Sequence, residues 1–186
     1  MNLILNDENL QLDEVNEFNS KVRAILVDNE NRVLVANYGG IFLFPGGSID
    51  DDENIAESII RELQEETGTS YETGDLTFLT QLDFFQKNYV KRDGTKANRL
   101  IRTYYFIAQC KPVELQSQKL TEKEKKDGFK LEIVPICELK KIVLENQNSN
   151  PRNIYFQREM IEVVGLFTNV LGQEDFVKKI RKKQLK

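Results

Sequence analysis

The sequence predicts an α/β or α+β sandwich, in which helices pack on a mixed β-sheet. Three observations favour this class: β-rich runs separated by turn formers, helical periodicity between and after those runs, and no internal repeat. Strands interleaved with helices are typical of layered domains and not of helical bundles. At 186 residues the chain fits one ordinary domain, with or without an added helical segment.

Two β-rich runs open the predicted sheet, at residues 22–27 and 32–36. The residues between them, Asp-Asn-Glu-Asn, are turn formers, so the two runs are expected to pair as a hairpin. A third short run at 41–44 ends at Pro45-Gly46-Gly47. Further elements are expected in this order: a strand at 76–85, a turn at 92–95, strands at 99–110 and 129–135 with a charged loop at 121–128 between them, and a short helix at 138–144.

A helix is predicted over residues 52–67. Ile55, Ile59 and Leu63 recur every four residues and form a continuous apolar stripe. The three aspartates at 50–52 are expected to cap its start, where negative charge is favourable. Gly68 is expected to end it, as glycine does just beyond a helix.

The two ends of the chain are expected to lie outside the central domain. Residues 1–20 are polar with scattered leucines and are predicted to be an N-terminal extension, in which a short strand or helix fits. The central domain is predicted over 21–145, followed by a polar linker at 146–151. The C-terminal extension, 152–186, is predicted to form helices near 154–171 and 174–183. Their apolar residues must be covered, either by the domain or by the partner in a homodimer.

Composition excludes several classes of function. The net charge of −4 argues against salt-driven binding to extended nucleic acid. No run approaches the ~20 apolar residues of a membrane helix, and the start of the chain does not resemble a signal peptide. The two cysteines are far apart, so a reducing cytoplasm is expected. Because the chain has no histidine, catalytic triads and histidine metal ligands are excluded, and chemistry must rest on carboxylates or an oxygen-bound metal.

The end of the predicted helix carries an unusual group of acids. Glu62, Glu65 and Glu66 are spaced by three and four residues, so they crowd one face near the helix C-terminus. Like charges there repel one another, and the helix dipole disfavours anions by a further ~0.3–1 kcal/mol each. Three converging carboxylates without histidine or cysteine suit Mg²⁺ or Mn²⁺. The helix pattern alone also fits a solvated acidic face with Arg61 as a partner.

The surrounding pattern favours the metal site. From Gly47 the chain has five residues, then Glu53, seven residues, and Arg-Glu-Leu-Gln-Glu-Glu-Thr-Gly-Thr at 61–69. This resembles the Nudix box, G-x5-E-x7-R-E-U-x-E-E-x-G-U, where U is a bulky aliphatic residue. Every position matches except the last, where Thr69 replaces an aliphatic residue. The resemblance implies an α/β/α sandwich with a mixed sheet, followed here by C-terminal helices.

The resemblance also implies roles for individual residues. Glu62, Glu65 and Glu66 would hold the metal, Mg²⁺ with Mn²⁺ as a substitute, and the Gly46 carbonyl would add an oxygen. Arg61 would orient a box glutamate, and Glu53 would belong to the metal and water network. The same resemblance implies an enzyme that cleaves the pyrophosphate bond of a nucleoside diphosphate linked to another group, by attack of an activated water on phosphorus.

Other candidate residues lie outside the box. Some family members take a further ligand or general base from a later loop, and Glu124 is the first choice in the loop at 121–128, with Glu122 next. An ordinary charged surface loop is the alternative. Four strand cations are candidates to contact a substrate phosphate, although such residues are more often outward-facing strand charges: Lys21, Arg23, Arg99 and Arg102.

Two further classes of function fit the sequence. A catalytically silent Nudix-like domain would bind a nucleotide derivative as a sensor, but such a domain has no need for the complete glutamate set found here. An acidic interaction protein would use its helical tail to dock on a partner or on a second copy. Within the hydrolase class the substrate is open, with a MutT-like preference for a nucleoside triphosphate.

Overall fold

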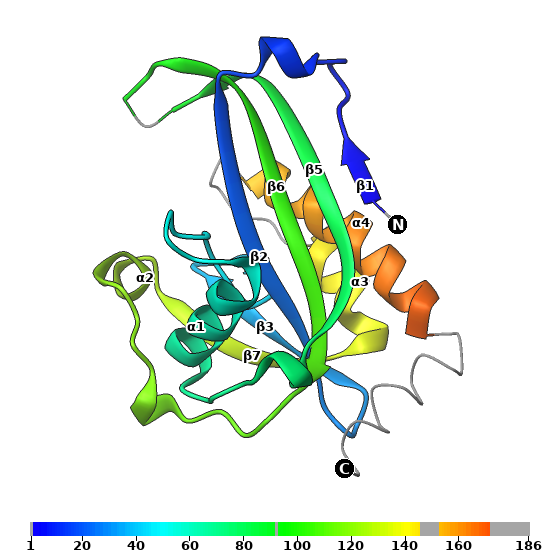
Figure 1. The fold of residues 1–186 in the computed structure, drawn as a ribbon. Helices are drawn as coiled ribbons and strands as arrows, with labels where there is room; N and C mark the ends of the chain where they lie inside the picture. Colours follow the sequence, from blue (N-terminus) through cyan, green and yellow to red (C-terminus); the bar gives the residue numbers. More distant parts are fainter. Residues whose placement is uncertain (1, 92, 146–152, 172–186) are drawn as a thin grey trace.

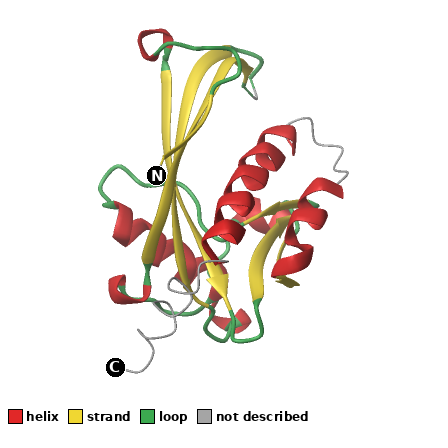
Figure 2. Ribbon diagram, turned by 90° about the vertical axis from the view of Figure 1, so that its right-hand side faces the viewer, coloured by secondary structure: helices red, strands yellow, loops and turns green. Residues whose placement is uncertain are grey.

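The structure is a computed structural model that describes residues 2–91, 93–145 and 153–171. It is a three-layer sandwich with a mixed sheet in the middle (Figures 1 and 2). Helix α1 (Ile55–Thr67) covers one face, and α3 (Ile136–Glu145) and α4 (Asn153–Leu171) cover the other. The predicted fold class is confirmed.

The sheet has seven strands in the order β1-β5-β6-β2-β3-β4, and β7 pairs with β3. The strands are β1 (Asn2–Leu5), β2 (Glu17–Val27), β3 (Arg32–Tyr38), β4 (Ile41–Leu43), β5 (Thr77–Val90), β6 (Lys96–Gln109) and β7 (Phe129–Pro135). β2 runs parallel to β6, and β1 runs parallel to β5. The segment at 1–20 therefore adds strand β1 to the sheet, and β2 begins within it.

Strands β2 and β3 separate soon after their hairpin turn. They share two register pairs, Leu26↔Leu34 and Val27↔Val33, whereas β2 pairs with β6 along its whole length. Beyond this point the segment before α1 takes the place of β3: the amide of Ala24 donates to the Pro45 carbonyl, and that of Val22 donates to Gly47. The divergence of the two strands thus brings the Pro-Gly-Gly segment into the sheet.

Each face of the sheet has its own apolar core. Ile59 and Leu63 of α1 pack with alternate residues of β2, which include Val22, Ala24 and Leu26. On the other face α3 and α4 bury Leu139, Met160, Val163, Val164 and Phe167. Because strand side chains alternate between faces, Lys21 and Arg23 of β2 point to the α4 side.

Several local predictions need correction. The helix at 52–67 begins at Ile55, because Asn54 and not an aspartate caps it: the Asn54 side chain accepts from the amides of Ala56 and Glu57. The loop at 121–128 contains a short helix, α2 (Glu122–Lys126), capped by Thr121. The strands predicted at 76–85 and 99–110 form one longer hairpin of β5 and β6, whose far end rises beyond the helices (Figure 1).

The C-terminal part of the described chain packs on the sheet. α4 matches the predicted helix at 154–171 and buries its apolar side against the chain's own core. The linker at 146–151 and the helix expected at 174–183 lie outside the described residues. Among the helices of the described residues, none has the length and apolar character needed to cross a membrane.

Candidate active site

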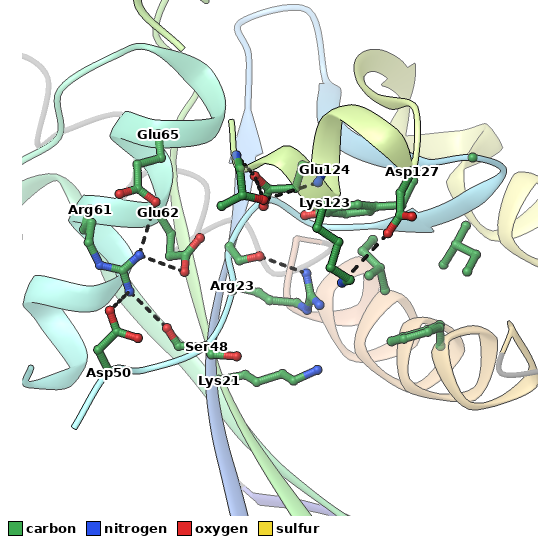
Figure 3. A pocket seen from close by; sticks show the side chains of 18 residues that line it. Lys21, Arg23, Ser48, Asp50, Arg61, Glu62, Glu65, Lys123, Glu124 and Asp127 are labelled. Atoms are coloured by element: carbon green, nitrogen blue, oxygen red, sulfur yellow. Dashed lines mark hydrogen bonds and ion pairs between the residues drawn. The ribbon is translucent and has the colours of Figure 1, made fainter. Parts of the chain in front are cut away.

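A cavity of about 840 Å³ opens beside the Pro-Gly-Gly segment, within the range of small-molecule sites. We call the part formed by residues 46–65 the acidic wall; it carries Gly46, Gly47, Ser48, Asp50, Arg61, Glu62 and Glu65. The rest is the opposite wall, which carries Lys21, Arg23, Tyr38, Gly39, Ile41, Leu43, Thr121, Lys123, Glu124, Asp127 and Phe156. Figure 3 shows Asp50, Glu62 and Glu65 around Arg61 on one side of the cavity, and Lys123, Glu124 and Asp127 on the other, with Lys21 and Arg23 between them.

Gly46 and Gly47 let the backbone come unusually close to its neighbours. Gly46 has a φ of +134°, and a Cβ there would lie 2.2 Å from the carbonyl oxygen of Val22. A Cβ on Gly47 would lie 2.3 Å from a carboxylate oxygen of Glu62. Only glycine avoids both clashes, so the segment can lie against β2 and against the Glu62 carboxylate at once.

Arg61 joins the acids of the acidic wall. Its guanidinium donates to both carboxylate oxygens of Glu53, at 2.6 and 2.9 Å, to Glu62 at 3.0 Å and to Glu65 at 3.3 Å. It also donates to the Ser48 carbonyl at 3.0 Å (Figure 3). The hydrogen bonds from Arg61 lower the pKa of Glu53 to about 2. One guanidinium therefore orients three box carboxylates, and its shortest hydrogen bonds are those to Glu53.

Glu62 and Glu66 are carboxylates taken out of water. Glu66 is 1% exposed; one of its oxygens accepts from the Gly46 amide at 2.8 Å and the other accepts from the Tyr38 hydroxyl. Burial raises the pKa of Glu66 to about 8 despite these hydrogen bonds. Burial also raises the pKa of Glu62, although Arg61 opposes the shift. Both pKa shifts indicate negative charge that the protein alone compensates incompletely.

Cations and an aromatic ring mark the opposite wall. Arg23 is buried, and one terminal nitrogen donates to the carbonyls of Phe44, at 2.7 Å, and Gly46, at 3.4 Å. The Lys21 nitrogen lies 6.0 Å from the centre of the Phe156 ring. Burial, together with the nearby charge of Arg23, lowers the pKa of Lys21 to about 8. An anion beside Lys21 would relieve both effects.

Helix α2 places Glu124 at the cavity. The Glu124 Oε2 atom accepts from the amide of Thr121 at 2.7 Å and from its hydroxyl at 2.9 Å. Asp127 also borders the cavity and lies 3.8 Å from Lys123 in an ion pair. Glu122 points elsewhere, to Lys125, and its side chain is 92% exposed. Of the acids in this segment, Glu124 and Asp127 line the cavity.

Arg99 and Arg102 do not join the cavity. Arg102 forms a paired contact with Asp83, at 2.7 and 2.8 Å, on the long β5–β6 hairpin. Arg99 donates to Gln86 and lies 4.0 Å from Glu17. Neither residue is part of the cavity lining. Of the arginines considered on strands, the structure brings only Arg23 to the box.

Comparison with known proteins identifies the family. The sequence model of the NUDIX domain matches residues 18–157, three quarters of the chain. The chain belongs to the NUDIX domain family. It is 29% identical over 106 residues to an 8-oxo-dGTP diphosphatase of Proteus vulgaris, a match that covers 54% of this chain and 80% of that protein. Together these findings make the chain a Nudix pyrophosphohydrolase.

The chain is also similar to solved structures. The E. coli ORF135 protein superposes with a TM-score of 0.54 at 14% identity, over 89% of this chain and 98% of that one. A MutT protein from Bacillus halodurans gives a TM-score of 0.49 at 21% identity, over 76% of this chain and 82% of that one. At 14% identity the likeness to the ORF135 protein concerns the fold alone.

The Nudix box residues fit a hard divalent cation. Within the described residues no group of three or more acids is already arranged around a common point, and Arg61, Tyr38 and the Gly46 amide each hold a box carboxylate. The donor set nevertheless consists of oxygens alone, as Mg²⁺ and Mn²⁺ prefer. The side-chain-free surface of Gly47 leaves room for the Glu62 carboxylate at the cavity. Buried, incompletely compensated carboxylates gain most from such a cation.

Two cavity neighbours come from α4 and were missed by sequence reasoning. Phe156 lines the opposite wall, and Glu159 is 4% exposed beside Arg23. A signal for Glu159 was present: it lies four residues before Val163 and eight before Phe167, within the apolar stripe of the helix. A carboxylate in a buried stripe requires a partner, and that partner is Arg23.

Proposed function

We propose that the chain hydrolyses the pyrophosphate bond of a nucleoside diphosphate linked to another group, with a nucleoside triphosphate as the preferred class. The observation that carries this proposal is the cavity itself, which brings Nudix box carboxylates together with the cations Lys21, Arg23 and Lys123. The similarity to an 8-oxo-dGTP diphosphatase supports a triphosphate. We also propose a reducing cytoplasm as the compartment, since Cys110 and Cys137 are free thiols.

Glu62, Glu65 and Glu66 would hold Mg²⁺ or Mn²⁺, with the Gly46 carbonyl as a further donor. When bound, the cation neutralises the pyrophosphate and lowers the pKa of an attacking water. Arg61 keeps Glu62 and Glu65 oriented, and its pairing with Glu53 fixes the guanidinium itself. Tyr38 holds Glu66 from the opposite side.

The remaining residues bind the substrate and move a proton. Lys21 would give the opposite wall the positive charge that phosphate oxygens require, with the buried Arg23 behind the cavity surface. Glu124 would accept the proton of the attacking water at Oε1, since Oε2 already accepts from Thr121. A new P–O bond forms to the water oxygen as the bridging P–O bond breaks. The products are a nucleoside monophosphate and pyrophosphate or a second phosphorylated group.

A substrate panel tests the proposal. Nucleoside triphosphates, including 8-oxo-dGTP, are compared with a dinucleoside polyphosphate, ADP-ribose and a nucleotide sugar at saturating Mg²⁺. We expect a triphosphate to give nucleoside monophosphate and pyrophosphate in equal amounts by ion-exchange chromatography. Release of orthophosphate instead, or no turnover of any compound with Mg²⁺ or Mn²⁺, would refute the proposed reaction.

A further inference from the structure

A buried charge pair joins the C-terminal helix to strand β2. Arg23 and Glu159 are each 4% exposed, and the Arg23 Nε atom lies 3.7 Å from the Glu159 Oε1 atom. Within the described residues, Nε has no hydrogen-bond partner, so charge and not a directed hydrogen bond joins the two groups. The Tyr105 hydroxyl donates to the same Glu159 oxygen.

The other side of Arg23 contacts one proposed metal donor, the Gly46 carbonyl. Its NH1 group donates to the carbonyls of Phe44 and Gly46. The amide of the same Gly46 donates to Glu66 at 2.8 Å. A continuous series of contacts therefore runs from Glu159 of α4, through Arg23 and Gly46, to Glu66 in the Nudix box.

Arg23 without Glu159 would disturb that site in two ways. A buried guanidinium needs a nearby negative charge, since water cannot solvate it. Glu66 is the box carboxylate whose charge already acts on Arg23, so it is the alternative partner. A guanidinium drawn toward Glu66 would compete with a cation for that carboxylate, and its uncompensated charge would repel the cation.

We propose that Glu159 is a positioning residue for the metal site. By neutralising Arg23 it keeps the guanidinium on the carbonyls of Phe44 and Gly46, and leaves Glu66 available to a divalent cation. The proposal rests on the proposed function, because it concerns the cation that the box would bind. Glu159 also lies beyond the NUDIX domain match, which ends at residue 157, so a residue outside the match would contribute to the site.

Substitution of Glu159 in the full-length chain tests this role. Glu159→Gln keeps the shape of the side chain and removes its charge. Mn²⁺ binding, measured by calorimetry without substrate, should weaken about tenfold, as expected for a group that acts through a ligand. The Mg²⁺ concentration for half-maximal turnover should rise by a similar factor. At saturating Mg²⁺ kcat should recover, because no group that touches the substrate is changed.

Two further variants separate positioning from folding. Tyr105→Phe removes the hydrogen bond to Glu159 and keeps every charge, so it should lower the melting temperature without weakening Mn²⁺ binding. Glu159→Asp keeps the charge but withdraws it from Arg23, so Mn²⁺ binding should fall between wild type and Glu159→Gln. If Glu159→Gln does not fold, the contrast between Glu159→Asp and Tyr105→Phe carries the test.

Each outcome decides between the two proposals. A folded Glu159→Gln variant with wild-type Mn²⁺ affinity would overturn the positioning role and leave the proposed function intact. Equal weakening in Tyr105→Phe and in the Glu159 variants would also overturn it, because it would reveal a role in folding alone. A wild-type chain that binds neither Mn²⁺ nor Mg²⁺ would overturn both.

Discussion

The acidic wall of the cavity comes from one short stretch of chain, whereas the opposite wall is gathered from distant elements. Residues 46–65 supply the whole acidic wall, and the spacing of Arg61, Glu62 and Glu65 along one helix sets their arrangement. Lys21, on β2, meets Phe156 only because α4 covers the face of the sheet to which Lys21 points. A local motif therefore determines the proposed metal chemistry, whereas tertiary packing determines which groups contact the substrate.

The largest expected effect comes from the acidic wall. Glu65→Gln removes a proposed metal-holding charge at the cavity, and should reduce kcat on the order of 10³–10⁴-fold, as loss of metal-borne charge stabilisation implies. Steady-state turnover of the best panel substrate under limiting Mg²⁺ measures it.

Glu57→Gln is the matched control on the same helix. Glu57 is exposed, and its side chain accepts from the Asn54 amide in the capping box, a role that glutamine also fills. This variant should keep wild-type turnover. Near wild-type activity in Glu65→Gln, or equal losses in both variants, would contradict the proposal that Glu65 holds the metal.

The next effect concerns stability on the α4 side. Phe167 is fully buried, so Phe167→Ala should lower the free energy of unfolding by about 3–5 kcal/mol. Ile154 lies on the same helix with 60% of its surface exposed, and Ile154→Ala should change that free energy by less than about 0.5 kcal/mol. Urea titration followed by circular dichroism measures both. If both variants lowered the free energy of unfolding by similarly small amounts, α4 would not belong to the core.

Sequence reasoning reached the acidic wall, and of the opposite wall it named Lys21, Arg23 and Glu124 but not Phe156. The Nudix box and the end of α1 at Gly68 follow from local spacing. The start of α1 was misplaced, because three aspartates resemble a cap more strongly than the single Asn54 that the Glu57 side chain completes. Arg23, Arg99 and Arg102 looked equivalent on strands. Only Arg23 lies beside the Pro-Gly-Gly segment, because β2 diverges from β3 and pairs with that segment instead. No local pattern in the sequence encodes this divergence.

The third prediction uses pH to probe the acidic wall. Burial raises the pKa of Glu66 from 4.5 to about 8, so in the metal-free protein its folded form holds a proton that the unfolded form has lost. Its contribution to stability is therefore complete below about pH 4.5 and is lost as pH rises through about 8. A bound cation favours the charged form and opposes this loss.

Mg²⁺ should accordingly stabilise the protein more at about pH 8.5 than at about pH 6, and its affinity should rise by up to about tenfold per pH unit while one proton is displaced. Melting temperatures across a Mg²⁺ titration at the two pH values measure this. Glu66→Gln is the control, since it should be at least as stable as the metal-free wild type and should lose the pH dependence of the Mg²⁺ effect. A Mg²⁺ effect that ignores pH in the wild type would contradict proton competition at Glu66.

The smallest expected effect tests the opposite wall. Lys21 borders the cavity next to Phe156, and its lowered pKa of about 8 indicates a charge that lacks full compensation. A substrate phosphate would supply that compensation, so Lys21→Met should raise KM about tenfold, the weight of one charge-assisted hydrogen bond. The effect should fall on KM more than on kcat, because Lys21 is not one of the groups proposed to hold the metal or to move a proton.

Arg102→Met provides the comparison for Lys21. Arg102 is also a strand cation, but it is paired with Asp83 on the β5–β6 hairpin, outside the cavity lining. Its loss should leave kcat and KM unchanged while slightly lowering stability, as expected for a partly exposed ion pair. The two variants thus remove the same charge from two places on the sheet. If Arg102→Met raised KM as much as Lys21→Met, the cations would act through the overall field of the protein, and the opposite wall would have no specific phosphate contact.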